Sequence, residues 1–144
     1  MHVILPVALA TAAAAALINL WIGVRVGRLR MAEKVMVGDG GNERLLAGMR
    51  AHANFVEYAP FVLILLALVE LAAGTSAWLW AASIVFIAGR LLHVFGMEGW
   101  RPGRMIGIGA TWAVLLGLAV YAAVLPFRSA PPVDATPVEV VPSA

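Results

Sequence analysis

The chain has 144 residues, of which 62% are hydrophobic and only 12% are charged. Because soluble domains carry about 25% charged residues, this composition excludes a disordered chain and a water-exposed enzyme. The net charge of +2 and the lack of a basic stripe argue against nucleic-acid binding, and the absence of cysteine excludes disulfides and thiolate metal sites. The sequence therefore predicts an integral membrane protein.

Three segments contain no Asp, Glu, Lys or Arg and reach or approach the roughly 20 apolar residues that a membrane-spanning helix needs. They are residues 1–24, 71–89 and 105–127. A fourth candidate, residues 55–73, is apolar except for Glu57 and Glu70. We predict an all-α fold, a bundle of four transmembrane helices that forms one domain over residues 1–127. The regular spacing of small residues in the last helix predicts close helix packing at Gly103, Gly107, Ala110, Ala113 and Gly117.

The two ends of the chain need separate interpretation. The alanine-rich residues 1–24 would also suit a cleaved signal peptide, but they have no basic n-region and are long for a signal, which favours a retained helix. Residues 128–144 are rich in proline and lack a helical period, so we expect a disordered tail.

Basic residues are concentrated in two of the three connections between the predicted helices. The first connection contains Arg25, Arg28, Arg30, Lys34, Arg44 and Arg50. The third contains Arg101 and Arg104, whereas the second, AAGTSA, has no charge. The positive-inside rule then places the first and third connections in the cytoplasm and both termini on the other side.

The segment RAHANFVEYAP, residues 50–60, places polar side chains inside an otherwise apolar helix. Arg50, Asn54 and Glu57 are spaced i, i+4 and i+7 and share one helix face, whereas His52 points away from Arg50. Pro60 loosens or kinks this helix, unless it is simply a tolerated membrane proline. Glu70, near the outer end, is expected to reach the solvated interface.

A second polar segment, GRLLHVFGM at residues 89–97, places Arg90, His93 and Met97 at i, i+3 and i+7. At about 1.5 Å per residue, Glu57 and Arg90 lie about 6–9 Å short of the cytoplasmic boundary of a hydrocarbon core of about 30 Å. One layer from all four helices then holds Arg28, Arg50, Asn54, Glu57, Arg90, His93 and Arg104.

Charges inside a membrane usually have partners, and Glu57 and Arg90 match in depth and in sign. A buried ion pair between them, which only locks two helices together, would explain these two residues. It would not explain the layer, because one glutamate cannot neutralise four arginines. The surplus positive charge suits a small anionic ligand, and arginine binds carboxylates with two parallel hydrogen bonds.

These residues resemble the MAPEG family, the membrane-associated proteins in eicosanoid and glutathione metabolism. The matching motifs are GRLR at residues 27–30, RAHANFVEYAP, and GRLLHVFGM followed by RPGR at residues 101–104. The likeness spans roughly residues 1–125 and is strongest to the bacterial branch, whose members are often functionally undefined. It implies a microsomal glutathione transferase-like subunit of a homotrimer in a bacterial inner membrane. The orientation from the positive-inside rule then makes both termini periplasmic.

The resemblance also implies a glutathione site between neighbouring subunits near the cytoplasmic face. The implied contacts are Arg50, Asn54, Glu57 and His93, together with Arg28 from an adjacent subunit. The polar layer described above adds Arg90. Arg104 corresponds to the catalytic arginine that stabilises the thiolate. The short connection EGWRPGR leaves Arg101 as an alternative, and Met97 stands where eicosanoid-handling members carry tyrosine.

The chemistry that follows is thiol transfer to a lipophilic electrophile dissolved in the bilayer, as a transferase or a peroxidase with glutathione as cosubstrate. Arginines would hold its carboxylates, Glu57 would hold its ammonium group, and positive charge lowers the pKa of a thiol from about 8.5. Two alternatives remain open. One is a non-catalytic MAPEG-like binding protein, and the other is a small proton-coupled multidrug transporter, although the arginines would repel cationic drugs.

Overall fold

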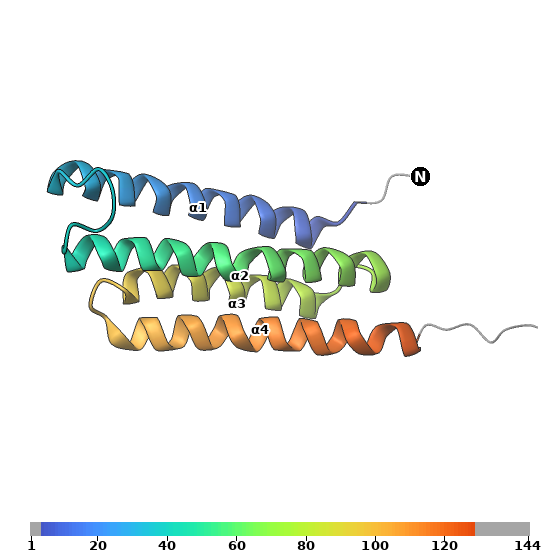
Figure 1. Ribbon diagram of the computed structural model, residues 1–144. Coiled ribbons are helices and arrows are strands. Elements are labelled where there is room, and N and C mark those ends of the chain that lie inside the picture. Colours follow the sequence, from blue (N-terminus) through green and yellow to red (C-terminus); the bar gives the residue numbers. More distant parts are fainter. Residues whose placement is uncertain (1–3, 129–144) are drawn as a thin grey trace, which may run out of the picture.

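The computed structural model describes residues 4–128, which form four antiparallel helices (Figure 1). They are α1 (Pro6–Glu33), α2 (Glu43–Ala73), α3 (Ala77–Gly96) and α4 (Arg101–Arg128). All four are long and apolar enough to span a membrane, and residues 4–128 contain no strand. The predicted all-α bundle of four transmembrane helices is therefore confirmed. The predicted disordered tail, apart from Arg128, lies outside the described residues.

The helices extend beyond the charge-free segments of the sequence. α1 continues past residue 24 as far as Glu33 and ends at Lys34, which adopts a left-handed conformation with φ 56°. α2 begins at Glu43, twelve residues before the apolar block, with the side chain of Asn42 accepting a hydrogen bond of 2.9 Å from the N–H of Leu45. Apolar runs thus identify the spans but not their charged ends, which continue as helix.

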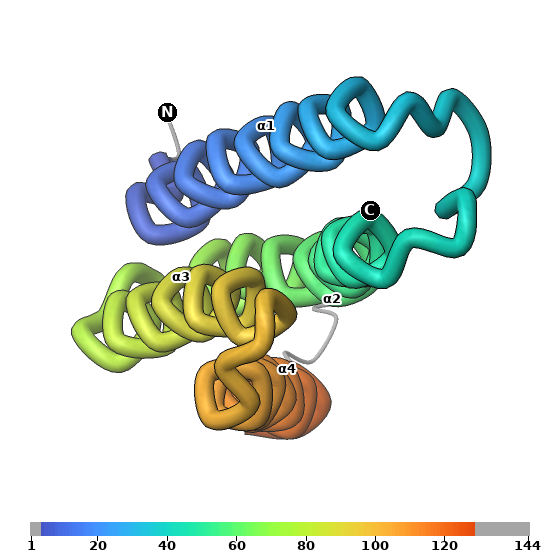
Figure 2. Tube along the Cα trace, turned by 90° about the vertical axis from the view of Figure 1, so that its left-hand side faces the viewer, coloured from blue at the N-terminus to red at the C-terminus, as the bar shows by residue number. Residues whose placement is uncertain are grey.

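α1 and α4 lie on opposite sides of the α2–α3 pair (Figure 2), and no contact between them is found among the described residues. α3 packs most closely on α4. A Cβ atom at Gly96 would lie 2.1 Å from the backbone nitrogen of Arg104, and one at Gly107 would lie 2.6 Å from that of His93. Glycine is therefore what allows the two helices to approach, and their contact fixes His93 beside the start of α4.

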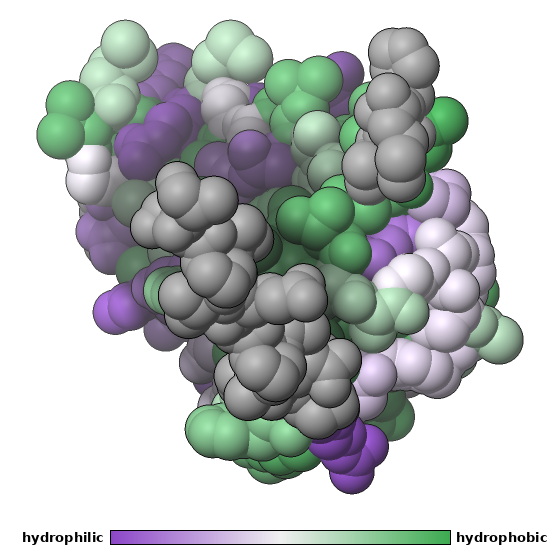
Figure 3. Space-filling model, turned by 90° about the vertical axis from the view of Figure 1, so that its right-hand side faces the viewer, coloured by the Kyte–Doolittle hydropathy of each residue, from purple (hydrophilic) through white to green (hydrophobic). Residues whose placement is uncertain are grey.

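The predicted small-residue contact of α4 is confirmed only in its first half. Gly103 and Gly107 are buried, whereas Ala113 is exposed and Gly117 has open space around it. Inside the bundle, large side chains such as Ile22, Leu66, Phe86 and Leu118 form a continuous apolar core. Many large apolar side chains face outwards instead, and hydrophobic residues (green) are visible on several sides of the bundle in Figure 3. This outward-facing apolar surface suits contact with lipid.

The expectation that Glu70 is solvated is wrong. Its side chain is only 2% exposed, and its carboxylate accepts hydrogen bonds from the backbone N–H groups of Val7 at 3.0 Å and Ala8 at 2.8 Å. The hydroxyl of Thr75 donates a third at 2.8 Å. The first N–H groups of a helix have no partner within the helix and attract negative charge. Glu70 therefore caps the beginning of α1 from the neighbouring helix.

Candidate functional site

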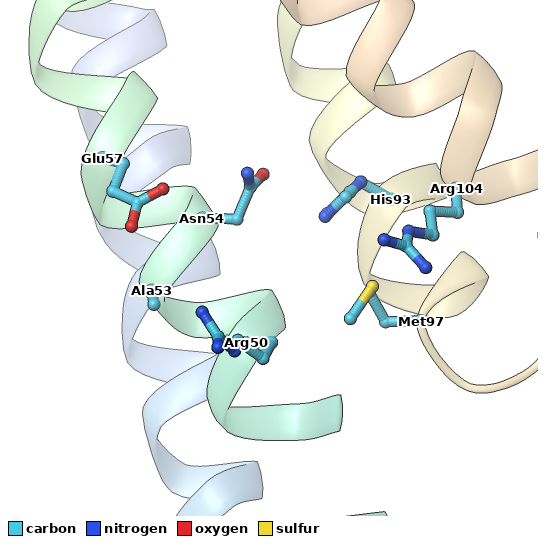
Figure 4. Close-up of a pocket in the computed structure, with 7 residues that line it drawn as sticks. All are labelled: Arg50, Ala53, Asn54, Glu57, His93, Met97 and Arg104. Carbon is cyan, nitrogen blue, oxygen red and sulfur yellow. The ribbon is translucent and has the colours of Figure 1, made fainter. Parts of the chain in front are cut away.

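A pocket of about 290 Å³ opens near the end of the bundle that carries the α1–α2 and α3–α4 connections. Its lining residues come from three helices and are Arg50, Ala53, Asn54 and Glu57 of α2, His93 and Met97 of α3, and Arg104 of α4 (Figure 4). Five of the seven residues predicted from the sequence therefore line a single cavity.

The helical spacing in α2 accounts for one wall of this pocket. Arg50, Asn54 and Glu57 share one face of the helix. In Figure 4 the side chains of Asn54 and Glu57 extend towards the side of α3, whereas the guanidinium of Arg50 lies over α2. His93 faces them from α3 and is only 4% exposed. Arg104, in the first turn of α4, is held near His93 by the glycine contact between these two helices. The pocket thus combines two exposed arginines, one exposed carboxylate and an amide.

Arg90 lies behind the pocket rather than on its surface. It is 0% exposed, and its guanidinium donates hydrogen bonds to Asn54 Oδ1 at 2.9 Å and to Thr111 Oγ1 at 3.4 Å. Its Cζ atom also lies 5.4 Å from the centroid of the Phe55 ring. The ion pair with Glu57, which was one of two interpretations of these residues, is not found within residues 4–128. A similar depth in the membrane does not bring Arg90 and Glu57 together, because Arg90 turns towards Asn54 and α4. The only ion pair found in this part of the chain joins Arg25 to Glu98.

Arg28 is not among the lining residues of the pocket. It lies exposed on α1, on the far side of the α2–α3 pair from α4. The expectation that it reaches the site of an adjacent subunit stays a prediction. His52 faces away from the pocket, as its spacing predicts: its Nε2 atom lies 2.9 Å from Asn19 Oδ1 on α1.

A second cavity, of about 620 Å³, adjoins the pocket and shares Asn54, His93 and Arg104 with it. Its remaining lining residues are mostly apolar or aromatic and are Tyr58, Arg101, Met105, Ile108 and Trp112. Tyr58 and Trp112 are site residues that were not predicted from the sequence. Their helical spacing was the available signal, since Tyr58 follows Asn54 by four residues and Trp112 follows Arg104 by eight.

A third cavity, of about 550 Å³, lies between α1, α2 and α3 and includes Arg25, Arg44 and Glu98 among its lining residues. Met97 lines both this cavity and the polar pocket. Met97 therefore forms part of the boundary between the two cavities, and its thioether has no hydroxyl to offer a ligand.

The fold and the pocket together define a class of protein, a membrane-spanning four-helix bundle with an arginine-rich pocket towards one end. The chain belongs to the MAPEG family, whose model matches residues 8–124. It is similar to the inner membrane protein YecN of Escherichia coli strain K12, with 38% identity over 95 residues, which cover 63% of this chain and 70% of YecN. YecN of Escherichia coli O6:H1 strain CFT073 matches to the same extent. The family predicted from the motifs is confirmed.

Proposed function

We propose that this protein is a membrane-bound, glutathione-dependent transferase or peroxidase that acts on a lipophilic electrophile. The observation that carries the proposal is the convergence of Arg50, Glu57 and Arg104 on one pocket from two different helices. Glutathione has two carboxylates, one ammonium group and one thiol. Arg50 offers a partner to one carboxylate, Glu57 to the ammonium group and Arg104 to the thiolate, which leaves the second carboxylate for Arg28 of a neighbouring subunit in the proposed trimer.

The polar groups of the pocket suit separate parts of this ligand. Arg50 offers a planar guanidinium to a carboxylate, and Glu57 accepts hydrogen bonds from the ammonium group. At about 290 Å³ the pocket is at the lower end of the range of about 300–1,000 Å³ for small-molecule sites. The proposed homotrimer supplies the remainder, with Arg28 of a neighbouring subunit joining the pocket.

Arg104 is the residue that we assign to the sulfur. Positive charge beside a thiol lowers its pKa from about 8.5, and a depression of two units corresponds to about 2.7 kcal/mol in favour of the thiolate. In the transferase reaction the thiolate sulfur of glutathione forms a bond to an electrophilic carbon of the acceptor while the bond from that carbon to a leaving group breaks; the leaving group departs with the electron pair, and the thiol proton passes to water. In the peroxidase reaction two glutathione thiols reduce one hydroperoxide to an alcohol and water and are oxidised to a disulfide. Because the adjoining apolar cavity shares Arg104 and His93, an acceptor bound there would lie next to the sulfur.

The inner membrane is the proposed location, supported by the name of the related inner membrane protein YecN. The positive-inside rule places the end with the α1–α2 and α3–α4 connections in the cytoplasm, since these connections and the adjoining helix ends carry most of the basic residues. Both termini would then be periplasmic. The pocket would open near the cytoplasm, from which a water-soluble thiol can enter, while an acceptor can arrive through the bilayer.

Calorimetric titration of the purified protein in detergent with glutathione tests the proposal. The wild type should bind at millimolar concentrations or below, and Arg50→Ala and Glu57→Gln should each weaken binding by at least about tenfold, or 1.4 kcal/mol. Arg128→Ala and Glu33→Gln are matched controls, because both residues are exposed and lie outside the three cavities. Absence of binding by the wild type at millimolar glutathione would overturn the proposal.

The presence of Met97 in the pocket favours a second candidate, a binding protein of the same family without turnover. Methionine cannot donate a hydrogen bond to a developing charge, whereas a tyrosine can. Glutathione binding without thiolate absorbance, and without product from a panel of hydrophobic electrophiles, would support this candidate. Proton flux driven by a cationic drug in liposomes would instead support a transporter.

A further inference from the structure

Arg90 is a completely enclosed cation without a carboxylate partner among the described residues. Its hydrogen bonds go to an amide and a hydroxyl, and its Nε atom has no partner within residues 4–128. A buried charge without an opposite charge as its partner is costly to keep. Stabilisation of the fold therefore does not account for an arginine at this position. Its hydrogen bond to Asn54, a residue of the pocket, suggests a role in the site instead.

The contact between Arg90 and Asn54 fixes which way the Asn54 amide points. An arginine side chain has five N–H donors and no acceptor, so its partner at 2.9 Å must be the amide oxygen rather than the amide nitrogen. The Nδ2 group of Asn54 makes no hydrogen bond within residues 4–128. It is not one of the buried atoms without a partner, so it is accessible rather than enclosed. Asn54 lines the pocket and the adjoining cavity, so this amino group is left to face a ligand.

We propose that Arg90 is a positioning residue that fixes Asn54 as a hydrogen-bond donor to the ligand. This inference rests on the proposed function. It adds the direction of one hydrogen bond, which runs from the Asn54 amino group to the ligand. The ligand atom beside Asn54 is then an acceptor, such as a carboxylate or carbonyl oxygen or a sulfur in its thiolate form. The ammonium group is bound elsewhere in the pocket, at Glu57. Donation by a cation to the amide oxygen also strengthens the amide as a donor on its opposite side.

The first test needs no ligand and compares two substitutions of Asn54 by thermal unfolding in detergent. Asn54→Asp places a carboxylate oxygen where the amide oxygen accepts from Arg90, so it should unfold at or above the wild-type temperature. Asn54→Leu removes the acceptor and leaves the buried guanidinium without its shortest hydrogen bond, so it should unfold at a lower temperature. A fall for Asn54→Asp as large as that for Asn54→Leu would overturn the assigned pairing.

The second test is the affinity of the same Asn54→Asp variant for glutathione. This variant keeps a partner for Arg90 but replaces the amino group that faces the pocket with an acceptor. We expect its dissociation constant to rise by at least about tenfold. If Asn54 instead received a hydrogen bond from the ammonium group, the added negative charge would preserve or tighten binding, and that result would overturn the proposal.

Substitutions of Arg90 separate positioning from a purely structural role. Arg90→Met should keep or raise the unfolding temperature, because it removes an enclosed charge, yet weaken glutathione binding by about tenfold. Arg90→Lys retains a donor and should restore most of the affinity. Thr111→Val is the matched control: it removes the longer hydrogen bond of Arg90, 3.4 Å, without touching Asn54, and it should change affinity by less than about twofold. Full affinity of Arg90→Met would overturn the proposal.

Failure of the proposed function gives a different pattern from failure of this inference. If the wild type does not bind glutathione, the proposed function is refuted, while the unfolding temperatures of the Asn54 variants still decide which way the amide points. If the wild type binds and Asn54→Asp binds equally well, the function stands and the donor role of Asn54 is refuted.

Discussion

The carboxylate of Glu70 on α2 accepts a hydrogen bond of 2.8 Å from the backbone N–H of Ala8 at the beginning of α1. The same carboxylate accepts a second hydrogen bond from Val7 and a third from Thr75. These contacts join α1 to α2 at the end of the bundle opposite the pocket. The contact matters for the placement of α1, which has no contact with α4 within residues 4–128. Near it, Thr11 and Ser83 share a hydrogen bond of 2.6 Å that joins α1 to α3.

We expect Glu70→Gln to lower the free energy of unfolding by about 1.5–3 kcal/mol, because a hydrogen bond to a charged group contributes about that much and one N–H group of α1 would lose its acceptor. Unfolding of the purified protein in detergent measures this change. Glu33→Gln, at an exposed position, should leave stability unchanged. Equal stability of the two variants would show that Glu70 does not hold α1.

Gly107→Ala should destabilise the contact between α3 and α4. The added Cβ atom would lie 2.6 Å from the backbone nitrogen of His93 and 2.5 Å from the carbonyl oxygen of Gly89, so the helices must separate. Overpacking of this kind costs about 1–3 kcal/mol, and the displaced His93 should also weaken glutathione binding. Gly117→Ala is the matched control, because nothing lies within 4 Å of its Cβ position. A neutral Gly107→Ala would contradict the close approach.

Arg104→Ala should abolish the ultraviolet absorbance of bound thiolate, whereas Arg101→Ala should retain it. Arg104 lines both the pocket and the adjoining cavity, but Arg101 lines only the adjoining cavity. Both arginines are exposed residues in the first turn of α4, so the pair is matched in helix position and exposure. Absorbance that survives Arg104→Ala and disappears in Arg101→Ala would transfer the role to Arg101.

Trp112→Ala should raise the KM for a long-chain electrophile by about tenfold and change the KM for a small one much less. The reason is that Trp112 lines the apolar cavity, and burying a large apolar side chain against a substrate contributes about 1.5–3 kcal/mol. Steady-state rates with two electrophiles of different chain length measure the effect. Trp80, an exposed residue of α3 outside the three cavities, provides the control substitution Trp80→Ala. Equal changes for both electrophiles would contradict a role in chain binding.

The sequence was sufficient to predict the four helices and five of the lining residues of the pocket. Apolar runs identify spans because lipid demands them, and the i, i+4, i+7 spacing of Arg50, Asn54 and Glu57 determines a common helix face without tertiary information. The prediction failed at the helix ends. There, charged residues such as Arg25 and Glu43 continue the helices beyond the apolar core.

Pairwise contacts between helices were not predictable in the same way. Glu57 and Arg90 agree in depth and charge, but the rotation of α3 about its axis decides that Arg90 meets Asn54 and Thr111 instead. Glu70 was predicted to be solvated, because the sequence of α2 does not reveal that the free N–H groups of the first turn of α1 lie beside it. Both cases concern packing partners, which depend on helix rotation and not on periodicity.

Within residues 4–128, Met97 is the one side chain that lines both the polar pocket and the cavity between α1, α2 and α3. Residue 97 is therefore a single position at which the sizes of two compartments are coupled. A smaller side chain would widen both cavities at once, and a bulkier one would narrow both. Oxidation of the thioether to a sulfoxide would have a third effect, since it would turn the apolar partition polar without any change of sequence.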